Sequence, residues 1–179
     1  AQAPTSYWTA RETAFVAPDY GRLFADLVIS GVAHAENAID LARKRMADDS
    51  DIGEAFSIGR ECISAILTAT AQWLGHRDGL SEGLLFEGCT LPEKIAAYGL
   101  DHWIRLFGRD LAACYTDRGA MDLAVVKMLS RHVERLLWCF GIYCWPQDEY
   151  VRCVISDRKL RPQMGTAARS LATSYASYC

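Results

Sequence analysis

A run of apolar residues with helical spacing, between positions 55 and 74, most constrains how this chain can fold. The apolar positions recur about every 3.5 residues, which is the spacing of long helices that pack side by side. They are Ala55, Phe56, Gly59, Cys62, Ile63, Ile66, Leu67, Thr70, Trp73 and Leu74. A helix over about 51–75 with this seam needs a long, nearly parallel or antiparallel helical partner.

Other segments also carry helical spacing or helix-capping residues, and no strand-like alternation competes with them. Four glycines between Gly75 and Gly88 predict a break after the seam helix. The pattern Thr90-x-x-Glu93 is typical of a capping box that opens a helix. The sequence therefore predicts an all-α fold. Its further helices are expected over about 19–45, 90–115, 121–145 and 147–159, with Pro162 ending the last one.

Length and charge indicate one ordinary domain. The chain has 179 residues and a formal net charge of −3, which argues against a strongly basic nucleic-acid-binding body. No apolar run approaches the ~20 residues of a membrane-spanning helix, and the first residues lack a signal-peptide pattern. We expect a soluble, cytosolic domain over 1–162 and a mobile, small and polar segment over 163–179.

The seven cysteines do not form a recognisable metal or disulfide framework. Their number is odd, no Cys-x-x-Cys occurs, and several lie in apolar periodic segments, where a free thiol behaves as a small hydrophobic group. We interpret most of them as buried thiols. The alternative is that one or two lie at a seam between subunits and cross-link when oxidised.

Signatures of catalysis or cofactor binding are missing from the sequence. His34 and Glu36, like His132 and Glu134, are two residues apart and so point to different sides of a helix. A di-metal helical bundle uses Glu-x-x-His instead, and phosphate-binding loops and the hydrolase elbow have no match. We therefore expect no enzyme activity, no metal and no cofactor, with the four histidines at the surface or at an interface.

Two basic clusters have a simple interpretation. Arg43, Lys44 and Arg45 suit the end of a solvated helix better than a phosphate or membrane contact. The segment 152–179 holds five basic residues, and its mild bias supports only weak, salt-sensitive contact with nucleic acid.

The run from Arg135 to Trp145 contains too many apolar residues for one helical stripe. A helix that is apolar all round must be covered on several sides. Another subunit is expected to provide part of that cover, although burial within one chain is the open alternative.

Three blocks of the sequence resemble the core (capsid) proteins of hepadnaviruses and of their non-enveloped relatives, the nackednaviruses. The first block is 18–27, Pro-Asp-Tyr-Gly-Arg-Leu-Phe-Ala-Asp-Leu, similar to the family's entry into its first core helix. The second is 66–75, ending in Gln-Trp-Leu-Gly, where the family has Trp-Val-Gly. The third is Arg135-Leu-Leu-Trp138, followed by Glu149 and Val151. The blocks keep the family's order and cover about 100 residues.

The resemblance implies a capsid assembly domain over 1–162. Its spike over 51–145 would be a helical hairpin that pairs with a second chain into a four-helix bundle, and about 76–120 would be an insertion that enlarges the spike. Dimers would then build an icosahedral shell around the viral genome. The implied localisation is the virion capsid, with assembly in the host cytoplasm or nucleus.

The resemblance also implies roles for particular residues. The expected dimer interface comprises Cys62, Ile63, Leu67, Thr70, Trp73, Val133 and Leu137, with Cys62 as the first candidate for a cross-link at the two-fold axis. The expected contacts between dimers are Tyr150, Val151, Arg161 and Pro162. The expected hydrophobic anchors are Tyr20, Phe24, Trp138 and Phe140.

Two departures from the family pattern affect these expectations. The stretch from Gly75 to Trp138 is longer than in the mammalian viruses and closer to the avian type. The family's Arg-x-Pro-Pro-x-x-Tyr segment is also not reproduced after Arg161-Pro162. The family packages viral RNA or DNA with an arginine-rich tail that this chain lacks, and the sequence predicts nothing about an envelope protein.

Two other classes of protein remain as alternatives. A homodimeric helical-bundle protein with a binding or regulatory role would need the same seam. A helical metalloenzyme of the hemerythrin or ferritin kind is disfavoured by the missing ligand spacing.

Overall fold

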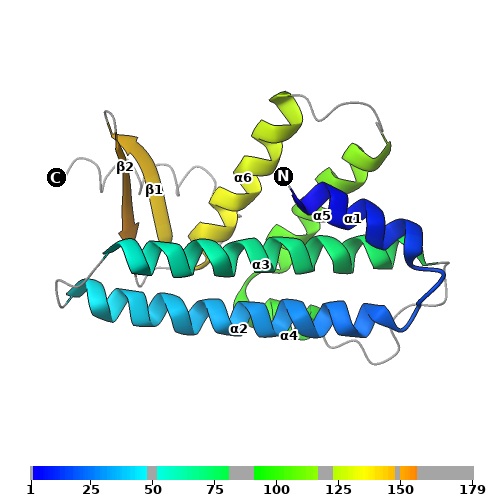
Figure 1. The fold of residues 1–179 in the computed structure, drawn as a ribbon, viewed down its shortest axis with the longest axis horizontal. Coiled ribbons are helices and arrows are strands. Elements are labelled where there is room, and N and C mark those ends of the chain that lie inside the picture. The colour runs from blue at the N-terminus through cyan, green and yellow to red at the C-terminus, as the bar shows by residue number, and fades with distance from the viewer. Residues whose placement is uncertain (1, 48–51, 81–90, 117–122, 148–149, 157–179) are drawn as a thin grey trace.

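The computed structural model describes residues 2–47, 52–80, 91–116, 123–147 and 150–156. This part of the chain is mostly helical, as predicted, and carries one antiparallel strand pair (Figure 1). None of its helices is long and apolar enough to cross a membrane. The elements are α1 (Gln2–Thr13), α2 (Tyr20–Ala47), α3 (Ile52–Gly79), α4 (Leu91–Tyr98), α5 (Asp101–Thr116), α6 (Leu123–Cys139), β1 (Ile142–Gln147) and β2 (Tyr150–Ile155).

The long helices α2 and α3 lie side by side and antiparallel (Figure 1). Val28, Val32 and Ala35 on α2 are buried in the same core as Ile63 and Ile66 on α3. The predicted seam therefore has a long antiparallel partner, but the prediction that this partner is the 121–145 segment is wrong within one chain. The apolar residues of α2 recur every three or four positions, so this helix can pack along the α3 seam as well as the 121–145 segment could.

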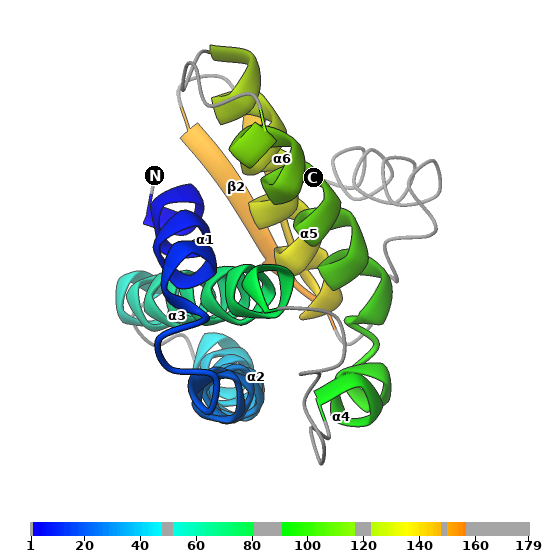
Figure 2. The same cartoon turned by 90° about the vertical axis from the view of Figure 1, so that its right-hand side faces the viewer.

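Helix α1 is not among the helices predicted from the sequence, and it lies on the side of α3 opposite α2 (Figure 2). Two glycines of α3 make this close approach possible. A Cβ at Gly75 would lie 2.1 Å from the Tyr7 carbonyl oxygen, and one at Gly79 would lie 2.2 Å from the Arg11 carbonyl oxygen. The predicted break at Gly75 is therefore wrong, because α3 continues to Gly79 and both glycines serve packing.

The helix predicted over 90–115 is two helices, α4 and α5, separated at Gly99. Gly99 has a φ of +74°, and the Leu100 N–H donates to the Ile95 carbonyl at 3.1 Å. These are the features of a glycine-terminated helix end. Helix α4 packs beside α2, and α5 packs against α1, α3 and α6 (Figure 2).

Helix α6 ends at Cys139, and the predicted helical continuation to Trp145 is wrong. Gly141, with a φ of +76°, turns the chain into β1, which pairs with β2. The helix predicted over 147–159 is likewise wrong where it is described, because residues 150–155 form β2. β-Branched and aromatic side chains are dense on both strands and favour extended structure.

Candidate functional site

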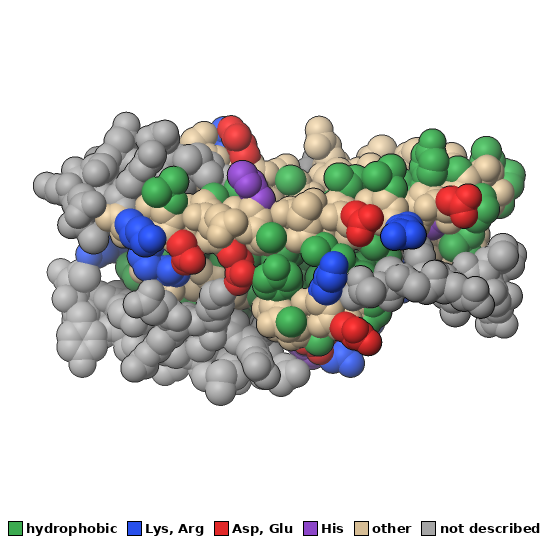
Figure 3. Space-filling model, turned by 90° about the horizontal axis from the view of Figure 1, so that it is seen from below, with side chains coloured by type: hydrophobic (Ala, Val, Ile, Leu, Met, Phe, Trp, Pro, Cys, Tyr) green, Lys and Arg blue, Asp and Glu red, His purple; other side chains and the backbone are tan. Residues whose placement is uncertain are grey.

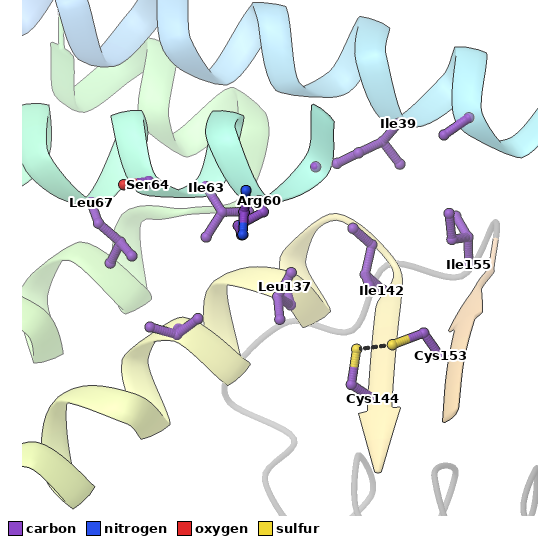
Figure 4. Close-up of a pocket in the computed structure, with 13 residues that line it drawn as sticks. Ile39, Arg60, Ile63, Ser64, Leu67, Leu137, Ile142, Cys144, Cys153 and Ile155 are labelled. Atoms are coloured by element: carbon purple, nitrogen blue, oxygen red, sulfur yellow. Dashed lines mark hydrogen bonds between the residues drawn. The ribbon is translucent and has the colours of Figure 1, made fainter. Parts of the chain in front are cut away.

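An apolar pocket opens where α3, α6 and the β1–β2 hairpin meet, and we call it the α3–α6 pocket (Figure 4). Its volume is about 360 Å³. Helix α3 contributes Gly59, Arg60, Ile63, Ser64 and Leu67, α6 contributes Val133 and Leu137, α2 contributes Ile39 and Ala42, and the hairpin contributes Ile142, Cys144, Cys153 and Ile155. This volume and apolar lining are typical of sites that bind a hydrophobic group.

Helical spacing explains why the two long walls converge. Ile63 and Leu67 are four residues apart on α3, and Val133 and Leu137 are four apart on α6, so each pair shares one helical face. The structure thus brings together four of the seven residues expected at a dimer interface. All four side chains line the same open pocket within the single chain.

The other three expected interface residues lie inside the chain. Cys62 is only 6% exposed, Thr70 is fully buried, and Trp73 is buried with the Arg77 guanidinium 5.4 Å from its ring centroid. Burial raises the pKa of the Cys62 thiol, and neighbouring Glu61 adds to this effect. Within this structure Cys62 is therefore shielded from a cross-link at the molecular surface.

The rim of the pocket is polar. Arg60 and Ser64 are exposed, and Glu61 is exposed on the next position of α3. A second, shallow groove runs along the same helix and is lined by Leu27 of α2 and by Ser64, Ala65 and Thr68 among others. This face of α3 combines small side chains with charges of both signs.

The expected hydrophobic anchors have different environments. Trp138 and Phe140 are buried, Trp138 with Tyr143 and Phe140 in the main core. Phe24 is half-buried and meets the His76 ring edge to face, with ring centroids 5.7 Å apart. Tyr20 is 55% exposed and touches Phe24, so it is not a buried anchor within one chain.

The residues expected to join dimers are described only in part. Val151 lies on β2 with 68% of its surface exposed. Tyr150 begins the same strand. Arg161, Pro162 and the predicted mobile segment 163–179 lie outside the described residues.

Exposed apolar side chains also gather where α2 begins (Figure 3). They are Phe15, Val16, Tyr20, Leu23 and Leu27. The last three recur at three- and four-residue intervals and form one stripe along the helix. Contiguous exposed apolar surface of this kind marks sites of association more often than scattered residues do.

A buried polar contact that the sequence does not reveal joins α5 and α6. The His132 Nε2 lies 2.9 Å from the Asp110 Oδ2, and the Trp103 Nε1–H donates to the His132 carbonyl at 3.0 Å. His132 and His76 are both buried, so the prediction of surface histidines is wrong for these two. Burial lowers the pKa of His132 although Asp110 opposes that shift. The neutral imidazole thus donates from Nε2 to the Asp110 carboxylate.

Metal-ligand geometry is not found among the described residues, where no three His, Cys, Asp or Glu side chains lie close enough to hold an ion. Comparison of the chain with protein-family models, curated protein sequences and solved structures gave no significant match.

Proposed function

We propose that this protein is a viral capsid (core) protein that forms homodimers and then assembles into an icosahedral shell, the virion capsid. The three sequence blocks that resemble hepadnavirus and nackednavirus core proteins support this class. The observation that carries the proposal is the α3–α6 pocket, because residues expected at the two-fold contact from that resemblance line one open apolar surface.

In the proposed dimer a second copy covers the α3–α6 pocket across a two-fold axis. Each chain then presents faces of α3 and α6 to its partner, so four helices meet at the two-fold axis. Because α6 crosses α3 instead of lying antiparallel beside it, this proposed contact differs from the expected bundle of two helical hairpins (Figure 1). Exposed Ser64 and Ala65 and half-buried Thr68 are small, so the two α3 helices can approach closely. Arg60 and Glu61 provide opposite charges that the two-fold operation can place opposite each other.

In the proposed shell, dimers meet through surfaces that the dimer leaves free. Val151 on β2 and the exposed stripe at the start of α2 are suited to this role because both are apolar and solvent-facing. Many such contacts act together in a closed shell, so each one can be weak.

The size of the purified protein tests the function. We expect electron microscopy and light scattering to show hollow particles of megadalton mass. A stable dimer that never forms larger particles would instead favour the alternative, a homodimeric helical-bundle protein with a binding or regulatory role.

A second experiment tests the position of the dimer contact. Ser64→Arg places a long charged side chain at the mouth of the α3–α6 pocket, where Ser64 is exposed, so the fold of one chain is preserved. We expect sedimentation velocity to show monomers and no particles. The matched control is Thr5→Arg on α1, an exposed residue that does not line the pocket and lies on a helix outside the proposed dimer contact. Normal dimers of Ser64→Arg would contradict this placement.

A further inference from the structure

Two cysteines on opposite strands of the hairpin lie in contact in the wall of the α3–α6 pocket. Cys144 of β1 pairs with Cys153 of β2, and their sulfur atoms are 2.6 Å apart (Figure 4). Both thiols are free and half-buried.

The backbone register places these cysteines at a favourable kind of strand position. Antiparallel pairs alternate between hydrogen-bonded and non-hydrogen-bonded types. Pro146 has no N–H, so its pair with Val151 is the non-hydrogen-bonded type, and the Cys144–Cys153 pair two residues along is of the same type. Three pairs from Cys144–Cys153, the alternation predicts a hydrogen-bonded pair between Gly141 and Ser156. The Ser156 N–H does donate to the Gly141 carbonyl, at 2.8 Å.

Non-hydrogen-bonded pairs suit a disulfide bond. Their Cα atoms lie about 4.5 Å apart, which falls within the range of about 4.4–6.8 Å that a disulfide spans. Both side chains also point to the same face of the hairpin, toward the pocket, as do those of Ile142 and Ile155. No backbone movement is needed to join the two sulfur atoms.

We propose that Cys144 and Cys153 are a reversible redox pair, which a low-molecular-weight disulfide such as oxidised glutathione converts into a disulfide bond across the hairpin. The thiolate of one cysteine attacks the glutathione disulfide and releases one glutathione thiolate. The second cysteine attacks the resulting mixed disulfide and releases the other. The two protein protons pass to the two departing glutathiones, so the protein pair is oxidised and the glutathione disulfide is reduced.

Cys139 is the alternative disulfide partner for Cys144, and its position in the fold makes that bond unfavourable. Cys139 is five residues from Cys144, so chain connectivity alone favours this pair at least as well. In the structure, however, Cys139 is buried in the main core at the end of α6. Selective joining of Cys144 to Cys153 would therefore depend on the folded hairpin.

Burial and the adjacent Cys153 thiol raise the pKa of Cys144 to about 12. Little Cys144 thiolate exists at neutral pH, so we expect oxidation to be slow. The reaction is therefore followed to equilibrium over hours. This time also allows glutathione to reach the two cysteines when any dimer or shell opens transiently.

Peptide mapping provides the test, because trypsin cleaves after Arg152 and separates the two cysteines. Folded protein is incubated with mixtures of reduced and oxidised glutathione, alkylated, and digested. We expect peptide 136–152 to be joined to peptide 153–158 through Cys144, and two of the seven thiols to be lost. Dithiothreitol should restore both thiols.

Three variants make the assignment specific. Cys144→Ser and Cys153→Ser should each abolish the joined peptides, whereas Cys114→Ser on α5 should leave them unchanged. A bond from Cys139 to Cys144, a stable glutathione adduct on either cysteine, or the retention of all seven thiols at high oxidised glutathione would each overturn the proposal. The result does not depend on whether the protein forms shells.

Discussion

The imidazole of His132 packs against the ring of Phe107, with centroids 5.1 Å apart, and is fully buried between α5 and α6. Burial alone would raise the pKa of Asp110, but hydrogen bonds from His132 and Arg109 outweigh it and lower that pKa. The His132 Nδ1 has no hydrogen-bond partner among the described residues. A proton added there would have no acceptor, which is why burial disfavours the charged form.

This contact predicts how stability depends on pH. The ordinary histidine pKa is 6.5 and the folded value is lower, so the folded state binds fewer protons than the unfolded state. The free energy of unfolding should be highest above pH ~6.5 and should fall as the pH drops below it. His132→Gln should reduce stability by about 1 to 3 kcal/mol at pH 8 and flatten the dependence between pH 7 and pH 5.

Urea unfolding at several pH values measures this effect. His34→Gln is the matched control, because His34 is exposed on α2. If His132→Gln left the pH dependence of stability unchanged and His34→Gln reduced it, the effect would belong to His34 and the prediction for His132 would be contradicted.

Single glycines decide where several elements end, and the sequence pattern did not identify which ones. Gly99 and Gly141 both adopt positive φ and end helices. Gly75 and Gly79, in contrast, continue a helix. Local sequence does not distinguish a glycine that ends a helix from one that admits a neighbouring backbone, since the second role depends on a segment far away in the chain.

The contact between α1 and α3 gives a prediction about one packed helix pair. Gly75→Ala would push a Cβ into the Tyr7 carbonyl group and displace α1, at a cost of about 1 to 3 kcal/mol. Gly59→Ala is the matched control on the same helix, because a Cβ there meets nothing within 4 Å. That variant should gain about 0.5 to 1 kcal/mol from helix propensity. Equal effects in thermal unfolding would show that α1 does not pack here.

Long periodic elements were predictable, whereas the hairpin was not. The α2 and α3 stripes span many turns, so their helical period is unambiguous. The apolar run around Trp138 to Trp145 is short, and short apolar runs fit a buried helix or a strand equally well. Helix α1 has few large apolar residues and is held by packing against α3 rather than by its own periodicity.

The helical residues that line the α3–α6 pocket were predicted to share a surface, but the residues that the hairpin adds to it were not. Ile63, Leu67, Val133 and Leu137 were expected on one surface, and the structure places them in one pocket. Cys144, Cys153 and Ile155 join it only because the chain reverses after α6. Gly141 turns the chain out of α6, and the pairing of β1 with β2 then places Cys144 opposite Cys153. A predicted helix over this segment could not bring the two cysteines together.

Assembly of the whole particle depends on surfaces that one chain leaves exposed, and Val151 gives the sharpest test. Val151→Ala removes about 1 kcal/mol or more of apolar burial from each contact between dimers. Each dimer makes several such contacts, so shells should require a concentration at least about tenfold higher. Because Val151 is 68% exposed in one chain, the dimer mass and thermal stability should stay unchanged. Leu41→Ala on α2, where the leucine is 46% exposed and belongs to neither proposed contact, is the control and should assemble normally. Light scattering against protein concentration measures both variants, and shells that form equally well with Val151→Ala would remove β2 from the contact between dimers.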